Sequence, residues 1–347
     1  MIGSLKAIWA KVAKLRGDLQ VNFGSYILRR VIYALIVLFV IITVNFFIFR
    51  VMPGDPVKMI IDPKMKPEVR EALYEQYGLK KPMSEQYFLY LKNLLTLNLG
   101  LSFTTSRPIM DELLERLPNT LKLLGIALIL EILIGVSVGI FAASKRGSAV
   151  ETFVTSAGLF THAVPGFFFQ LILLLLFGFL IPIFPIRGTM SAPPPVGAWA
   201  QLLDRLHHLI LPVFSLVIIN FGYWALYTRN AMVEALGQDY IVTARAKGLS
   251  KKTVLRHHAF RSILPPIITI IFLSLPGIIS GAVVTETIFS WFGVGRYLLD
   301  AVLKQDYPAA QGAFYFIALL TIISNFVADI VYGLVDPRIR VGGGEGK

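Results

Sequence analysis

The chain has 347 residues, of which 55% are hydrophobic and 16% are charged. Together with a mean hydropathy of +0.68, this balance excludes an ordinary soluble enzyme and is typical of an integral membrane protein. Cysteine is absent, which excludes disulfides, thiol nucleophiles and thiolate-bound zinc or iron–sulfur centres. The net charge of +12 would suit nucleic-acid binding in a soluble chain, so the position of the basic residues decides its meaning.

Six stretches of the chain are long and apolar enough to cross a bilayer, which requires about 20 apolar helical residues. Glu131 and Asp329 are the only charged residues within them. We therefore expect an all-α integral membrane protein with six transmembrane helices. The stretches are residues 31–49, 123–144, 152–186, 209–228, 262–285 and 309–332.

The third stretch is too long for one straight span, because a helix of that length would extend roughly 52 Å. We expect Pro165-Gly166 to break it, and Pro182 and Pro185 to end it. Counted as one span, it places residues 229–261 on the same side as the N-terminus. That side then carries 18 basic and six acidic residues, against 15 of each elsewhere. Basic loops face the cytoplasm, so both termini are predicted to be cytoplasmic.

The segment 53–118 is predicted to be a small, mainly helical extracytoplasmic insertion. It has nine basic and nine acidic residues, and it is too short to bury a large core by itself. One helix is expected from Pro67 to Gly78, and a second with Ser84 as its N-cap. The predicted organisation is a basic amphipathic extension (1–25), a first transmembrane helix (26–50), this cap (53–118), a five-helix membrane core (119–340) with a cytoplasmic loop (229–261), and a Gly-rich tail (341–347).

The inner loop after the fourth span predicts two helices that meet at a sharp turn. Gly248 can take left-handed backbone geometry and end the first helix, and Ser250 can cap the second. Ala244, Ala246 and Gly248 offer a surface with little side chain, which another protein could approach closely. The alternative interpretation is a basic loop attracted to anionic lipid. The basic residues around the turn are Arg245, Lys247, Lys251 and Lys252.

This loop resembles the ATPase-docking segment, the EAA loop, of permease subunits in ABC importers. The similarity is to the B-type subunit of the dipeptide/oligopeptide/nickel group, and it includes Val242 where the general motif has Glu. It rests on Asp239-Tyr240, Thr243-Ala-Arg-Ala-Lys-Gly-Leu-Ser250 and Leu264-Pro265, and further blocks extend it over residues 26–340. Those blocks are Tyr26-Ile-Leu-Arg-Arg30, Pro53-Gly-Asp-Pro56, Tyr77-Gly-Leu-Lys-Lys-Pro82, Leu99-Gly-Leu-Ser102, Phe289-Ser-Trp-Phe-Gly-Val-Gly-Arg-Tyr297, Asp306-Tyr-Pro308 and Asp336-Pro-Arg338.

The resemblance implies the pore subunit of an ATP-driven importer in the inner membrane of a prokaryote. Expected partners are a second permease subunit, two ATPase subunits, an extracytoplasmic binding protein and the lipid bilayer, with no nucleic acid. The chain has no complete phosphate-binding loop, since Gly248…Lys252-Thr253 lacks the second glycine. ATP and Mg are therefore expected on the partner ATPases, with no enzyme activity or cofactor in this chain. The implied coupling loop comprises Ala244, Arg245, Ala246, Lys247, Gly248, Leu249 and Ser250.

Polar residues inside the spans are candidates for function, because ionised groups there are costly. Asn325, Asp329 and Tyr332 share a helix face and are interpreted as a hydrogen-bonded structural cluster, with a substrate or proton site as the alternative. Glu131 is interpreted as a helix or subunit contact, or else as pore lining. The candidate pore or gate residues are Pro165, Phe167, Ser280 and Glu286.

A rival interpretation is an ion-coupled secondary transporter that uses Asp329, Glu131 and Glu286. Such transporters are commonly built from inverted repeats, and the first and last three spans show no self-similarity. The ATP-driven importer is therefore favoured. Its expected substrates are di- or oligopeptides, and oligosaccharides or nickel are the alternatives.

Overall fold

A computed structural model describes the chain over residues 2–51 and 81–335. The side chains of residues 2–23, 50, 51, 276–282, 332, 334 and 335 are not described. The predicted helix from Pro67 to Gly78, the blocks at 53–56 and 336–338 and the tail lie outside the described residues. The helices are α1 (Ile2–Val51), α4 (Met83–Leu95), α5 (Ile109–Ser144), α6 (Ala149–Ala163), α7 (Gly166–Leu174), η1 (Leu175–Leu180), α8 (Ala198–Leu236), α9 (Asp239–Ala246), α10 (Lys251–Thr253), η2 (Val254–Ala259), α11 (Phe260–Ile288), α12 (Val294–Leu303) and α13 (Tyr307–Val335).

Within the described residues, five helices are long and apolar enough to cross a membrane: α1, α5, α8, α11 with its preceding turns, and α13. A sixth candidate span is the pair Ala149–Ala163 and Gly166–Leu180, which is bent by 97°. Each half of the pair would extend only about 22 Å, which is too short to cross a bilayer core alone. The helical class and the break at Pro165-Gly166 are thus confirmed, and the structure contains five or six candidate spans.

The break between α6 and α7 follows from the chemistry of proline. Pro165 has no N–H to continue the helix, and its ring disfavours helical geometry in the preceding residue. Val164 is accordingly extended, with φ −79° and ψ 131°. Gly166 then begins α7 in a new direction.

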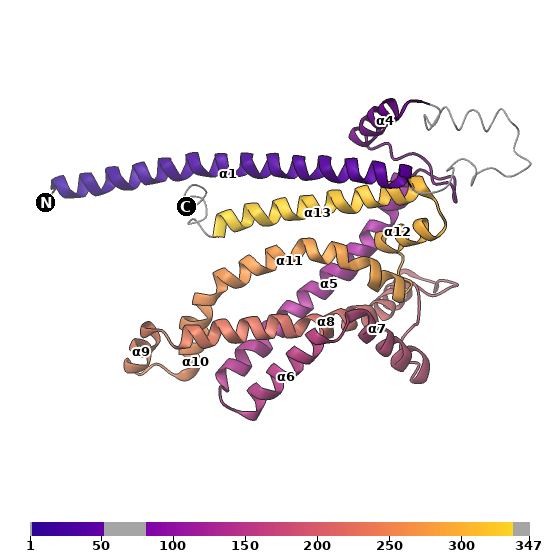
Figure 1. Ribbon diagram of the computed structural model, residues 1–347. Coiled ribbons are helices and arrows are strands. Elements are labelled where there is room, and N and C mark those ends of the chain that lie inside the picture. The colour runs from indigo at the N-terminus through magenta and orange to yellow at the C-terminus, as the bar shows by residue number, and fades with distance from the viewer. Residues whose placement is uncertain (1, 52–80, 336–347) are drawn as a thin grey trace, which may run out of the picture.

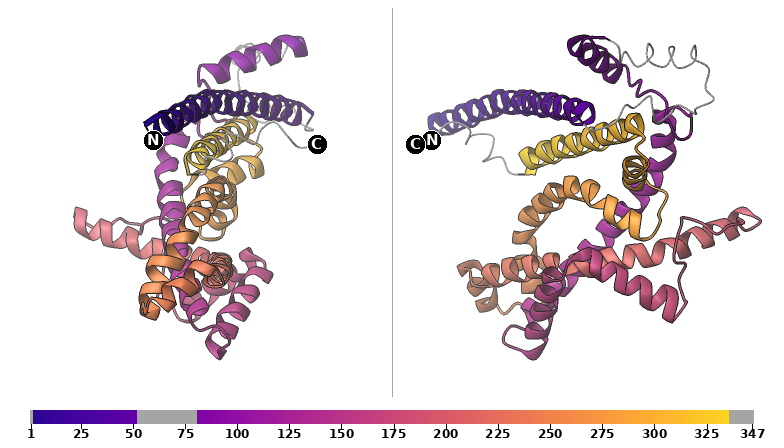
Figure 2. Two further views of the ribbon diagram at one scale, coloured as in Figure 1. Left: turned by 90° about the vertical axis from the view of Figure 1, so that its left-hand side faces the viewer. Right: turned by 45° about the vertical axis from the view of Figure 1, so that its right-hand side comes forward.

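The spans form a layered bundle in which α1 lies at one edge, next to α13 (Figure 1). Next to α13 lies α11, and α8 packs against α5 and α6 on the far side of the bundle (Figure 2). The start of α1, the end of α13 and the α9–α10 turn lie toward one end of the molecule, while α4 and α12 lie toward the other (Figure 1). This arrangement agrees with an even number of crossings between the two ends of the chain.

Helix α4 lies in the described part of the predicted cap, residues 81–118, and it leans on α1. The hydroxyls of Thr43 and Tyr87 lie 2.7 Å apart, and the side-chain amide of Asn45 donates to the hydroxyl of Tyr90 at 3.0 Å. The predicted cap at Ser84 is wrong, because α4 begins at Met83 with Pro82 at the N-cap position. Proline is favoured near helix starts because its fixed φ suits the helix.

The end of the bundle that carries α4 and α12 is held by buried acidic side chains. Tyr297 of α12 donates its hydroxyl to Glu112 of α5 at 2.6 Å. Burial and this hydrogen bond raise the pKa of the Tyr297 hydroxyl, so it remains a donor. Asp306 accepts from the Ser102 hydroxyl at 2.6 Å and from the backbone N–H of Thr104 at 2.9 Å. These bonds join the loop between α4 and α5 to the start of α13. Helix α5 runs unbroken through Pro118, so the boundary predicted there lies inside a helix.

Candidate functional site

The predicted coupling loop folds as two helices around a glycine turn. Helix α9 ends at Ala246, and Gly248 follows with φ +74°, in the left-handed region that glycine adopts at little cost. The hydroxyl of Ser250 then accepts from the N–H of Thr253 at 3.2 Å and caps the helix that continues into α11. Both local predictions, the stop at Gly248 and the cap at Ser250, are confirmed.

The turn is attached to the spans by one buried apolar face and by polar contacts. Ile241 of α9 is fully buried in a cluster with residues of α8 and α11. The hydroxyls of Tyr240 and Ser262 lie 2.8 Å apart, and Lys251 donates its ammonium group to the backbone oxygen of Ser144, the last residue of α5, at 3.1 Å. The turn is therefore packed against α8 and α11 and hydrogen-bonded to the end of α5.

The outer face of the turn differs from the predicted small-residue surface in one respect. Ala244 is only 4% exposed and packs inward with Ile241, so its place on that surface is corrected. It lies three residues from Ile241, which puts both on the same face of α9. The remaining members of the predicted loop are exposed: Arg245, Ala246, Lys247, Gly248, Leu249 and Ser250.

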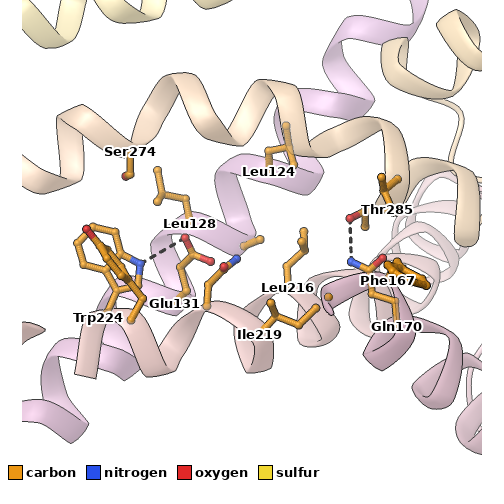
Figure 3. A pocket seen from close by; sticks show the side chains of 15 residues that line it. Leu124, Leu128, Glu131, Phe167, Gln170, Leu216, Ile219, Trp224, Ser274 and Thr285 are labelled. Carbon is orange, nitrogen blue, oxygen red and sulfur yellow. Dashed lines mark hydrogen bonds between the residues drawn. The ribbon is translucent and has the colours of Figure 1, made fainter. Parts of the chain in front are cut away.

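A second candidate site is a cavity of about 440 Å³ between α5, α7, α8 and α11. Gly166 and Phe167 line it, so the helix break lies at its wall (Figure 3). The ring of Phe167 is 53% exposed, at the rim. Irregular backbone within a membrane is tolerated where it is buried in protein or lines a cavity. The structure thus places the predicted Phe167, together with the Pro165 break, beside a cavity.

Polar side chains lie at two ends of this cavity. At one end, the indole N–H of Trp224 donates to the Glu131 carboxyl at 3.4 Å (Figure 3). At the other end, the Gln170 amide N–H donates to the Thr285 hydroxyl at 2.8 Å. Glu131 was left open between a helix contact and pore lining. It contacts Trp224 of α8 and lines this cavity, and pore lining stays a prediction. Gln170 and Thr285 were missed, although an uncharged polar residue in an apolar stretch is a recognisable signal.

Two other predicted gate residues do not join this cavity. Glu286, near the end of α11, is fully buried against the start of α12. It accepts from the Thr120 hydroxyl at 2.6 Å and from the N–H of Arg296 at 3.0 Å. A Cβ on Gly293 would collide with the same carboxylate, which explains the glycine there. Glu286 therefore holds α12 in place, and the gate interpretation is corrected. The side chain of Ser280 lies outside those described.

The predicted cluster around Asp329 has a different partner from the one expected. The carboxylate of Asp329 lies 3.3 Å from the Arg30 guanidinium of α1, and the Tyr26 hydroxyl donates to the backbone oxygen of Asp329 at 3.0 Å. Asn325 is exposed, and the Tyr332 side chain is not described. Asp329 is thus paired with the first span through Arg30, and its structural role stays a prediction.

Comparison with known proteins tests the family resemblance directly. The family model for the inner membrane component of binding-protein-dependent transport systems matches residues 135–341. The model for the N-terminal part of such membrane components matches residues 23–124. The two matches together cover nearly all of the described spans.

Full-length relatives agree with these matches. The oligopeptide transport system permease protein AppB of Bacillus subtilis is 36% identical over 318 residues, covering 91% of this chain and 99% of AppB. The di/tripeptide permease DppB of Pseudomonas aeruginosa is 38% identical over 331 residues, covering 91% and 98%. The dipeptide permease DppB of Escherichia coli K12 is 36% identical over 335 residues, with the same coverage.

These matches confirm the resemblance and set aside the secondary transporter. They also place this multi-pass chain in the cytoplasmic membrane. The protein belongs to the family of inner-membrane permease components of binding-protein-dependent ABC importers.

Proposed function

We propose that this chain forms one half of the pore of an ATP-driven importer of di- and oligopeptides. The observation that carries the proposal is the α9–Gly248–Ser250 turn, which is exposed outward and attached inward to three spans. Such a turn can receive a push from a partner and pass it to the bundle. The peptide substrate is supported by the names of the relatives, which are peptide permeases.

The ATPase partner is proposed to dock on the outward face of this turn. Val242, the residue that replaces the Glu of the general motif, is 61% exposed, and Leu249 is 39% exposed. Exposed apolar side chains beside a bare glycine backbone suit burial in a groove of another protein. ATP and Mg would be held by that partner, because this chain lacks a phosphate-binding loop.

The proposed orientation of the bundle gives the docking positions of the binding protein and the second permease subunit. The end that carries the α9–α10 turn is proposed to face the cytoplasm together with both termini, since the basic excess lies there. The binding protein would then dock at the opposite end, over α4 and α12. A second permease subunit is proposed to complete the pore opposite the cavity rim, where Phe167 and Tyr223 are about half exposed.

The proposal is tested by purifying the complex through a tag on this chain and reconstituting it in proteoliposomes with its binding protein. ATP-dependent uptake of labelled Ala-Ala and Ala-Ala-Ala is expected, and uptake of maltotriose and Ni²⁺ is not. Uptake of the sugar or the metal without the peptides would contradict the peptide assignment. Purification of this chain without any ATPase subunit would contradict the proposed coupling role.

A further inference from the structure

The cavity between α5, α7, α8 and α11 has a polar group at each end and an apolar wall between them (Figure 3). Leu216 and Ile219 lie between the Glu131 end and the Gln170 end. Its volume of about 440 Å³ falls within the roughly 300–1,000 Å³ of small-molecule sites. The cavity is therefore large enough for a short peptide and carries the uneven polarity that would orient one.

The Glu131 end lacks a cation. Glu131 is only 6% exposed, and it lies about 20 Å along α5 from Ser144 at 1.5 Å per residue, well inside the span. Trp224 donates to the Glu131 carboxyl at 3.4 Å, which is long for such a bond, and the neutral side chain of Asn220 is its other hydrogen-bond partner. Among the described residues that line the cavity there is no Lys, Arg or His. A carboxyl group at this depth is costly unless a cation or further donors reach it.

The Gln170 end lacks a donor. Gln170 is 3% exposed, and its amide nitrogen is used by Thr285. Its side-chain oxygen is buried with no hydrogen-bond partner among the groups that the structure describes. A buried acceptor without a donor is unfavourable. The Gln170 end therefore has a buried acceptor without a donor, and the Glu131 end has a buried carboxyl group without a cation.

We propose that the cavity is a transit site for the peptide, in which Glu131 binds the terminal ammonium group and Gln170 accepts a hydrogen bond from a peptide N–H. The inference rests on the proposed peptide import and adds where in this subunit the peptide is bound. A peptide with a free amino terminus carries both required donors, a cation at one end and amide N–H groups along its backbone. An oligosaccharide has hydroxyl donors but no cation.

Two variants of Glu131 separate this role from a structural contact. Glu131→Gln keeps the size and hydrogen-bonding capacity but removes the charge, whereas Glu131→Asp keeps the charge on a shorter side chain. Uptake of labelled Ala-Ala-Ala by the reconstituted complex is expected to fall about tenfold or more in Glu131→Gln, because the ammonium group would meet a neutral acceptor in place of a carboxylate. The fall is expected to be smaller in Glu131→Asp. The reverse order, with Gln tolerated better than Asp, would overturn the proposal and leave a structural contact to Trp224.

A labelling experiment tests occupancy without altering Glu131. The chain has no cysteine, so Ser274→Cys places a single reporter in the cavity lining. In the full complex trapped with ATP and vanadate, Ala-Ala-Ala on the binding protein is expected to slow labelling by a small maleimide severalfold. Equal rates with and without peptide would overturn the transit site, even where uptake by the wild-type complex upholds peptide import. Absence of uptake in the wild-type complex would instead overturn the proposed function together with this inference.

Discussion

The guanidinium of Arg30 lies 3.3 Å from the carboxylate of Asp329, which joins the first and last spans of the chain. Both side chains are partly exposed, at 38% and 21%. The same region contains a second link, from the Tyr26 hydroxyl to the Asp329 backbone oxygen. Because α1 lies at the edge of the bundle next to α13, these contacts attach the middle of α1 to the bundle.

We predict that Asp329 acts through Arg30 and carries no proton during transport. Asp329→Leu should lower the yield of assembled complex, because it leaves a charge unpaired, and Arg30→Leu with Asp329→Leu should recover most of the loss. The coupling energy in this double-mutant cycle should be about 1 kcal/mol, as for partly exposed ion pairs. Yield after size-exclusion chromatography and thermal unfolding of the purified complex measure it.

Asp329→Asn is the matched control for proton transport. Asparagine keeps an oxygen that can accept from Arg30 but cannot exchange a proton at neutral pH. It should therefore retain a substantial part of ATP-driven uptake. A variant that assembles normally and transports nothing would contradict the structural role.

The proposed orientation predicts opposite labelling of the two ends of the bundle. Glu85 of α4 and Val196, which is 97% exposed, should face outward, and Lys252 should face the cytoplasm. Single cysteines at these positions report cleanly, because the chain has none of its own. A membrane-impermeant maleimide added to spheroplasts should label Glu85→Cys and Val196→Cys but not Lys252→Cys until the membrane is opened. The opposite pattern would invert the topology.

Glu286 is predicted to stabilise the outer end of the bundle rather than gate the pore. Glu286→Gln should destabilise the complex by about 1–3 kcal/mol, because an amide NH₂ would face donors that now meet a carboxylate. Glu115→Gln is the matched control, since Glu115 is half exposed and pairs with Arg107 at the surface, where such pairs contribute little. Fluorescence of the buried Trp291, which donates to the Asn119 backbone oxygen, can follow unfolding. Full stability with lost uptake in Glu286→Gln would restore the gate interpretation.

Features set by a few neighbouring residues could be predicted from the sequence. The break at Pro165, the left-handed Gly248 and the Ser250 cap each depend on residues within one helical turn. The spans followed from hydropathy because the bilayer imposes their length.

Features set by packing between distant segments could not be predicted. The partner of Asp329 is on α1, at the other end of the chain, and the Gln170–Thr285 contact joins α7 to α11. Ala244 was placed on the wrong face, because its small side chain suits both a docking surface and the buried cluster around Ile241. In each case the helix and its register were predictable, but the neighbouring helix was not.

The α9–Gly248–Ser250 turn gives the most specific prediction. Gly248 has φ +74°, and a Cβ there would meet no atom within 4 Å, so a substitution is opposed by backbone strain and not by a clash. Gly248→Val should abolish substrate-stimulated ATP hydrolysis, because a β-branched residue disfavours this geometry. Gly248→Asn should retain part of it, because asparagine tolerates the left-handed region. ATPase assays of the reconstituted complex with loaded binding protein measure both.

Lysine variants distinguish ATPase coupling from lipid attraction at the same turn. Lys252 is exposed, and Lys251 donates to Ser144 from an exposed position. The buried cluster around Ile241 holds the turn without either lysine, so Lys251→Ala and Lys252→Ala should cost little ATPase activity. If the turn were a lipid anchor, the lysine changes would release it and the glycine change would be silent. Membrane insertion of all variants should equal that of the wild type, because the substitutions lie outside the apolar cores of the spans. Loss of activity in Gly248→Val with normal insertion would then place the ATPase contact on this turn, whereas loss confined to the lysine variants would place it elsewhere.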